Sequence, residues 1–169
     1  MKSALLVIDI QNLVVEGKPF AIEERLQLWQ DSLALVRQTG IEVIYIRHHD
    51  QELVKGTADW EIHSSVAPLA SEKIFDKTFN SAFKETSLHE YLQEQGIEQL
   101  IIMGMATNLC VDTTVKVAFE YGYQLAIIKD GTTTGFTGNL SPKNLIDQYQ
   151  MIWDGRFAQV DTLENIIRG

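Results

Sequence analysis

Short, continuous runs of apolar residues recur along this chain, and segments with helical spacing separate them. Ala4–Ile10 reads ALLVIDI and Leu100–Met103 reads LIIM. Neither run shows the alternation of apolar and polar residues that is typical of a strand with one solvent-exposed face. Continuous runs of this length are typical of strands that are buried on both faces of a parallel sheet. We expect four further strands, at Glu42–Arg47, Glu72–Asp76, Gln124–Lys129 and, as an edge strand, Phe157–Val160.

The segments between these runs favour helices. The clearest pattern is one apolar face made by Ile22, Leu26, Trp29, Leu33 and Val36, which Gly40 ends. Further helices are expected at Ser81–Gln95, from about Cys110 to Gly122, at Asn144–Met151 and at Thr162–Ile167, with a loop at Gln11–Pro19. Strands that alternate with helices predict parallel βαβ units. We therefore expect one domain spanning residues 1–169, folded as a three-layer α/β/α sandwich around a mainly parallel six-stranded sheet.

Composition excludes some classes of function. The net charge of −9 argues against a nucleic-acid or anionic-membrane surface. No apolar run approaches the roughly 20 residues of a membrane span. The apolar run near the N-terminus is too short for a signal peptide, and it is interrupted early by an acidic residue. A single cysteine cannot form an internal disulfide, so a reducing cytoplasm is the expected compartment.

The single cysteine, Cys110, follows a predicted buried strand and falls in the first turn of the next helix. A lone cysteine is usually an inert, buried residue. At a helix start, however, unpaired N–H groups and the positive end of the dipole favour a thiolate, so Cys110 is also a candidate nucleophile.

Two charged residues end other predicted strands. Asp9 ends the first strand, where it could cap a turn or act as a general base. Lys77 ends the third strand, where a lysine is by default a solvated surface charge. In a sheet of order 3-2-1-4-5-6, ligands bind at the carboxyl ends of strands one and four, where the strand order reverses. That order would make Asp9 and Cys110 neighbours, and Lys77 could reach them across the top.

The region after the second strand is rich in histidine and tryptophan. His48, His49 and Asp50 follow the strand, with His63 in the loop beyond, but their spacing matches no strong metal-ligand pattern. We favour a polar pocket edge or a surface loop over a metal site. Trp60 either covers the core or forms a flat wall for a substrate. Candidate pocket residues are Gln11, Trp60, Phe20 and Phe136; the aromatic ones suit a flat or aromatic substrate, but core or interface roles explain them equally well.

Three motifs together resemble the isochorismatase-like cysteine hydrolases, a family that includes nicotinamidases and related amidohydrolases. They are Leu6–Asn12 (LVIDIQN), Phe75–Phe83 (FDKTFNSAF) and Gly104–Val111 (GMATNLCV), in the family's order and at its usual separations. The resemblance implies a catalytic triad of Asp9, Lys77 and Cys110 and a cis peptide bond between Met105 and Ala106. It also implies the sheet order 3-2-1-4-5-6 and a homodimer or larger homo-oligomer.

The chain departs from the family's metal-binding members. Metal-binding nicotinamidases carry an Asp-x-His pair just after strand two, whereas here His48 stands in place of that aspartate and Asp50 in place of that histidine. The resemblance is therefore to metal-free members, and we expect no metal and no other cofactor. The isochorismate-cleaving branch generally lacks the nucleophilic cysteine, so Cys110 argues against vinyl-ether hydrolysis.

The leading hypothesis is hydrolysis of a C–N bond in a small amide through a thioester at Cys110. Asp9 would be the general base, Lys77 its electrostatic partner, and the N–H groups of Ala106 and Cys110 the oxyanion hole. Two alternatives stay open: a metal-dependent nicotinamidase that uses His48, Asp50 and His63, and a non-catalytic domain that has kept the fold. The identity of the amide is open.

Overall fold

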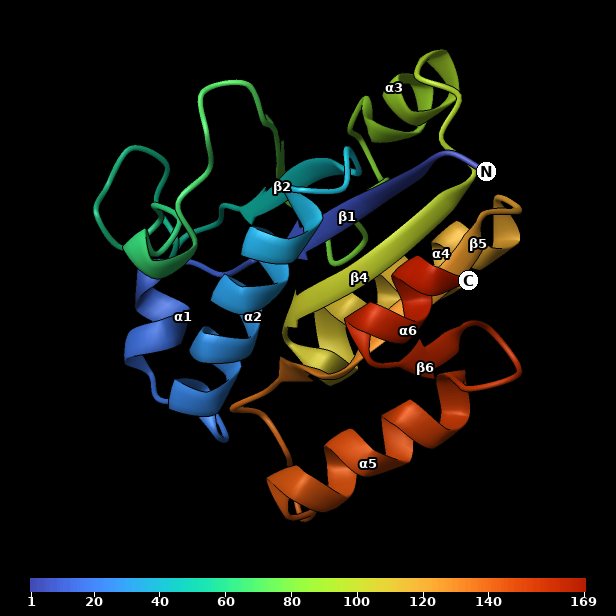
Figure 1. The fold of residues 1–169 in the computed structure, drawn as a ribbon. Coiled ribbons are helices and arrows are strands. Elements are labelled where there is room, and N and C mark those ends of the chain that lie inside the picture. Colours follow the sequence, from blue (N-terminus) through green and yellow to red (C-terminus); the bar gives the residue numbers. More distant parts are fainter.

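The computed structural model describes residues 1–169 and contains one six-stranded sheet between two layers of helices (Figure 1). The strands are β1 (Ser3–Ile8), β2 (Glu42–His48), β3 (Lys73–Lys77), β4 (Gln99–Met105), β5 (Gln124–Thr133) and β6 (Gln159–Asp161). Their order is β3-β2-β1-β4-β5-β6, and every neighbouring pair is parallel. The predicted fold class and strand order are confirmed.

The sheet is buried on both faces, which explains the continuous apolar runs. In β1, Ala4, Leu6 and Ile8 pack into one core cluster, and Leu5 and Val7 pack into the other. The first cluster is completed by α3 (Leu88–Glu94), α4 (Asp112–Glu120) and Trp153 at the end of α5 (Pro142–Trp153). The second is completed by α1 (Asn12–Glu16), α2 (Ile22–Val36) and α6 (Leu163–Arg168). No helix has both the length and the apolar character needed to cross a membrane.

Two expectations about local structure are wrong. The segment Ser81–Gln95 is helical only from Leu88, because tertiary contacts compete for its first half: the Ala82 N–H donates to Thr114 Oγ1 at 3.0 Å, and Glu85 has a φ of 54°. The expected loop at Gln11–Pro19 contains α1, which has one buried residue and so shows no apolar periodicity. Two short helices of other types also form, a 3-10 helix at Ser64–Val66 and a π-helix at Thr107–Val111.

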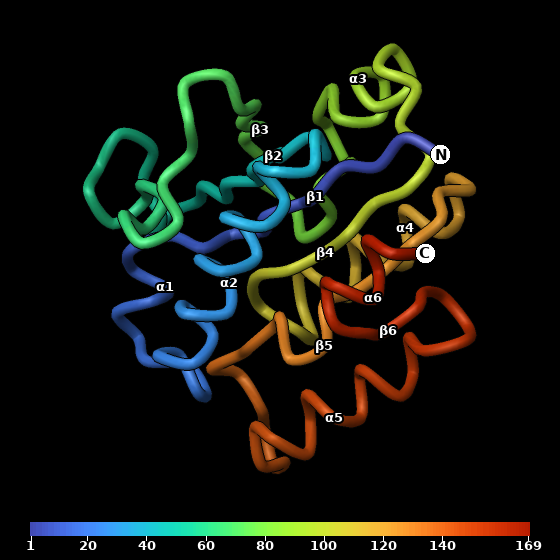
Figure 2. The backbone as a smooth tube through the Cα atoms, viewed as in Figure 1, coloured from blue at the N-terminus to red at the C-terminus, as the bar shows by residue number.

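The central strands β1 and β4 meet closely at their carboxyl ends. Gly104 of β4 pairs with Ile8 of β1, and a Cβ atom at Gly104 would lie 2.1 Å from the Ile8 carbonyl oxygen. Its φ of 132° is also unfavourable for other residues. Only glycine therefore permits the backbone approach that brings the residue after β1 beside the turn after β4 (Figure 2).

Replacing Gly104 with alanine is expected to lower the free energy of unfolding by roughly 3 kcal/mol or more, because backbone must move on both strands. Urea denaturation followed by circular dichroism measures the change. Gly135→Ala is the matched control, since the nearest atom to a Cβ there is Pro19 Cβ at 4.0 Å. Equal stability of the two variants would contradict the close approach.

Candidate active site

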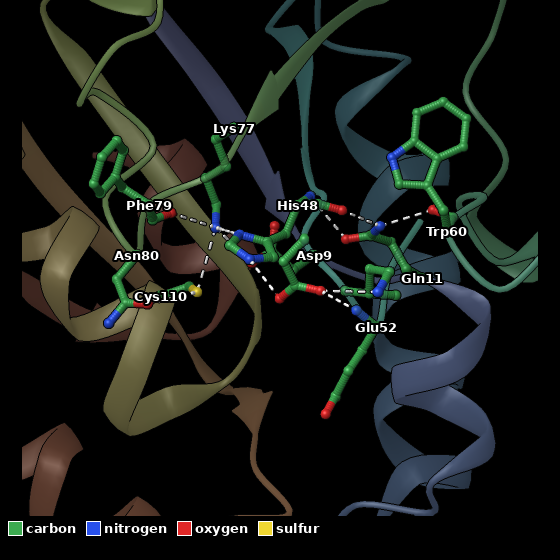
Figure 3. Close-up of polar contacts among 11 residues, drawn as sticks. Asp9, Gln11, His48, Glu52, Trp60, Lys77, Phe79, Asn80 and Cys110 are labelled. Atoms are coloured by element: carbon green, nitrogen blue, oxygen red, sulfur yellow. Dashed lines mark hydrogen bonds and ion pairs between the residues drawn. The ribbon is translucent and has the colours of Figure 1, made fainter. Parts of the chain in front are cut away.

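Asp9, Lys77 and Cys110 lie together at the carboxyl edge of the sheet (Figure 3). Asp9 directly follows β1, Lys77 is the last residue of β3, and Cys110 lies in the π-helix after β4. Lys77 Nζ is 2.9 Å from Asp9 Oδ2 and 3.3 Å from Cys110 Sγ. The convergence follows from the fold, because carboxyl ends of parallel strands share one edge and the strand order reverses between β1 and β4.

The Lys77 side chain is fully buried, with 0% of its surface exposed, so it is not a solvated surface charge. It reaches Asp9 past the end of β2, whose residue His48 pairs with Lys77 in the sheet register. The ammonium group also lies 2.9 Å from His48 Nδ1 and donates to the Phe79 carbonyl oxygen at 3.0 Å. A buried cation thus has several acceptors close by, as its desolvation requires.

Asp9 has one carboxylate oxygen that no group of the protein uses. Its side chain is 7% exposed and its φ of 52° is unusual for a residue other than glycine. Oδ2 pairs with Lys77, whereas Oδ1 is buried without a hydrogen-bond partner in the protein. Carboxylate oxygen and Cys110 Sγ belong to one group of atoms within 4.8 Å of each other. The side chain caps no turn, and the carboxylate lies close enough to Cys110 to be a candidate proton acceptor for the thiol.

The pKa of Cys110 is raised, contrary to the expectation that the helix start would favour a thiolate. Burial is the largest cause and the negative charge of Asp9 the next, and together they raise the pKa of Cys110 to about 12; the Lys77 cation acts in the opposite direction. Cys110 also does not lie in the first turn of a regular α-helix, because it belongs to the π-helix that precedes α4. Ionisation of the sulfur therefore requires a proton acceptor at the moment of reaction.

The turn before Cys110 contains the backbone groups predicted to hold an oxyanion. The peptide bond between Met105 and Ala106 is cis. The Ala106 carbonyl accepts from the N–H groups of Leu109 and Val111, while its own N–H donates no backbone hydrogen bond. The use of the Ala106 and Cys110 N–H groups as an oxyanion hole stays a prediction.

The side chains do not fit a metal ion. Ligand atoms of Asp9, His48 and Cys110 cluster within 4.8 Å, but Lys77 Nζ contacts all three and supplies the positive charge itself. The alternative set of His48, Asp50 and His63 does not form such a cluster. His48 Nε2 lies 3.1 Å from Asp50 Oδ2, and His63 Nδ1 accepts from the Ser65 N–H.

The four candidate pocket residues lie in different places. Gln11 is buried, and its amide is engaged by backbone groups of His48 and Trp60, so its geometry supports a structural role. Trp60 is 8% exposed beneath the Arg47 guanidinium and lies across Gln11 from Cys110 (Figure 3). Phe20 lies near Arg25. Phe136 is 66% exposed, and its carbonyl accepts from Asn108, two residues before Cys110.

The structure adds two side chains that the sequence did not assign to the thiol site. His48 contacts Lys77 directly, and the parallel register of β2 with β3 was the signal that could have placed it there. Asn80 Oδ1 lies 3.9 Å from Cys110 Sγ at the exposed side of the site. Asn80 belongs to a recognised motif, but nothing in its residue type singled it out.

Comparison with known proteins shows the family to which this chain belongs. Residues 3–150 match the Isochorismatase domain. The chain is 31% identical to the uncharacterized isochorismatase family protein YddQ of Bacillus subtilis, over 99% of this chain and 100% of that protein. It is 29% identical to Nicotinamidase 3 of Arabidopsis thaliana, over 78% of this chain and 73% of that protein. A crystal structure of an isochorismatase family protein superimposes with a TM-score of 0.87 at 29% identity, covering 94% of this chain and 96% of the other. The chain belongs to the isochorismatase family.

Proposed function

We propose that this protein hydrolyses the C–N bond of a small, non-peptide amide through a thioester at Cys110. The observation that carries the proposal is the contact of Lys77 Nζ with both Asp9 and Cys110, 2.9 Å and 3.3 Å away. A nucleophile, a base with a free oxygen and a buried cation are the parts that covalent amide hydrolysis needs. The similarity to a nicotinamidase, an enzyme named for an amide substrate, supports the same reaction class.

In the first step the Asp9 carboxylate takes the thiol proton while the sulfur attacks the amide carbonyl carbon. A C–S bond forms, and the carbonyl electron pair moves onto oxygen. The N–H groups of Ala106 and Cys110 would stabilise that oxyanion, and one such donor is worth on the order of 3 kcal/mol. Because proton transfer accompanies attack, a resting thiol with a raised pKa is compatible with this role.

In the second step the tetrahedral intermediate collapses and the C–N bond breaks. Asp9 returns its proton to the leaving nitrogen, which departs as ammonia or an amine and leaves a thioester. Asp9 then takes a proton from a water molecule whose oxygen attacks the thioester carbon. The C–S bond breaks, the carboxylic acid departs, and Asp9 returns the proton to the sulfur to restore the thiol. Lys77 keeps its positive charge throughout and compensates whichever of Asp9 or the sulfur is anionic.

The alternatives fit the site less well. A non-catalytic domain has no need for a buried lysine and aspartate, since their desolvation is costly. A metal-dependent nicotinamidase would have to displace the Lys77 ammonium from its three clustered neighbours. We expect the enzyme to work in the cytoplasm as a homodimer or larger homo-oligomer. A screen of small amides, nicotinamide included, with ammonia release as the readout tests the proposal and identifies the substrate.

Cys110→Ala is expected to abolish amide hydrolysis and leave the fold intact, since a smaller apolar side chain fits this half-buried position. Cys110→Ser should also fail, because the far higher pKa of a hydroxyl defeats a base suited to a thiol. Ammonia release and circular dichroism are measured on the same samples. Turnover above a trace in the alanine variant would rule out the covalent mechanism.

Activity is expected to survive exhaustive chelation, because Lys77 occupies the centre of the one side-chain cluster that could hold a metal. Ammonia release is compared before and after dialysis against a chelator, with metal content measured in parallel. Loss of activity that zinc, iron or manganese restores would revive the metal-dependent alternative.

Lys77→Met is expected to lower turnover by about 100-fold or more. It should also slow iodoacetamide labelling of Cys110 at every pH up to strongly alkaline values, because Lys77 is the cation that lowers the raised pKa of the thiol. Cys110 is the single cysteine, so the labelling rate reports on it alone. Lys73→Met, which removes an exposed lysine from the same strand, is the control. Superimposable labelling curves for Lys77→Met and wild type would remove Lys77 from the site.

A further inference from the structure

The ammonium group of Lys77 has more acceptors than protons. Nζ lies within 3.3 Å of Asp9 Oδ2, His48 Nδ1, the Phe79 carbonyl oxygen and Cys110 Sγ. An ammonium carries three N–H donors and no acceptor. The four neighbours therefore compete for three protons. An acceptor that fixes the direction of one N–H bond also restricts the directions of the other two.

The contact with Lys77 determines the tautomer of His48. Because the ammonium can only donate, His48 Nδ1 must be the unprotonated ring nitrogen. The ring proton then sits on Nε2, which lies 3.1 Å from Asp50 Oδ2 and donates to it. The partner of one ring nitrogen thus sets what the other can do, as is general for histidine.

Both members of this pair are held in place. The His48 N–H donates to Gln11 Oε1 at 2.9 Å, and the His48 carbonyl accepts from Gln11 Nε2 at 2.8 Å. Asp50 Oδ1 accepts from the N–H groups of Glu52 and Leu53, at 2.9 Å and 2.8 Å. Only Oδ2 of Asp50 is left to face the histidine, so Asp50 can accept the Nε2 proton while Lys77 donates to Nδ1.

We propose that His48, kept in its Nε2–H tautomer by Asp50, is a positioning residue that aims the Lys77 ammonium at Asp9 and Cys110. In this proposal, the His-x-Asp order by which the chain departs from metal-binding nicotinamidases serves to position the lysine. The imidazole takes one ammonium proton, and the other two are directed to Asp9, the Phe79 carbonyl and the sulfur. Its importance for turnover rests on the proposed function, but its effect on the thiol does not.

Asp50→Asn is the decisive variant. The two backbone N–H groups at Oδ1 require the amide oxygen of Asn at that position, so the NH2 group must face His48 Nε2. Nε2 then has to accept, the ring proton moves to Nδ1, and that N–H points at the Lys77 ammonium. We expect the iodoacetamide labelling rate of Cys110 to fall about tenfold or more at pH 8, the size of a lost charged hydrogen bond.

Two histidine variants separate the tautomer from packing. His48→Gln keeps a polar group toward Asp50 but has no acceptor at the position of Nδ1, and the labelling rate should again fall by about tenfold or more. His48→Asn keeps an oxygen acceptor near Lys77 and should stay within about threefold of wild type. In the His48→Asn background, Asp50→Asn should have no further effect, because no ring remains to change tautomer. His49→Gln on the neighbouring residue is the control, and thermal unfolding is followed for every variant.

The outcomes are distinct. Slow labelling in Asp50→Asn and His48→Gln, with recovery in His48→Asn/Asp50→Asn, supports the positioning role. Unchanged labelling in Asp50→Asn overturns it, and so does an equal loss in the double variant, which would indicate a structural effect. If wild type hydrolyses no amide in the screen, the proposed function fails while the labelling series still decides the role of His48.

Discussion

The buried ammonium group of Lys77 is the constraint on which the site depends. Removing an ion from water costs several kcal/mol, and here the cost is offset by the Asp9 carboxylate at 2.9 Å and by three further acceptors. The lysine therefore holds these acceptors in position, and they hold its ammonium group in position in turn. The pKa of the sulfur is raised because burial and the Asp9 charge outweigh the attraction of Lys77.

The fold delivers these groups to one point from four separate strands. Asp9 follows β1, His48 ends β2, Lys77 ends β3 and Cys110 follows β4, with Gly104 permitting the close contact of β1 and β4. At this edge of the sheet the cation is the protein's own lysine, and the histidine faces it. Such a site would keep its positive charge throughout the proposed reaction, in which the negative charge alternates between the carboxylate and the sulfur.

Much of this could be predicted from the sequence. Strands buried on both faces leave continuous apolar runs, and three motifs marked Asp9, Lys77 and Cys110. What failed depended on tertiary contacts: Ala82 bonds to Thr114 in place of a helical partner, and the pKa of Cys110 reflects burial depth and charge distances that no residue pattern encodes. His48 was noticed as a possible metal ligand, but its contact with Lys77 required the sheet register.

The central claim is that Asp9, Lys77 and Cys110 act as one unit, and a double-mutant cycle on amide turnover tests it most directly. With the best amide from a substrate screen, the rate is measured for Asp9→Asn, Lys77→Met and the two changes together. The account predicts that the double variant loses no more than about tenfold beyond the more damaged single variant, because either change alone disables the unit. Losses that multiply across the cycle would show two independent contributions and contradict it.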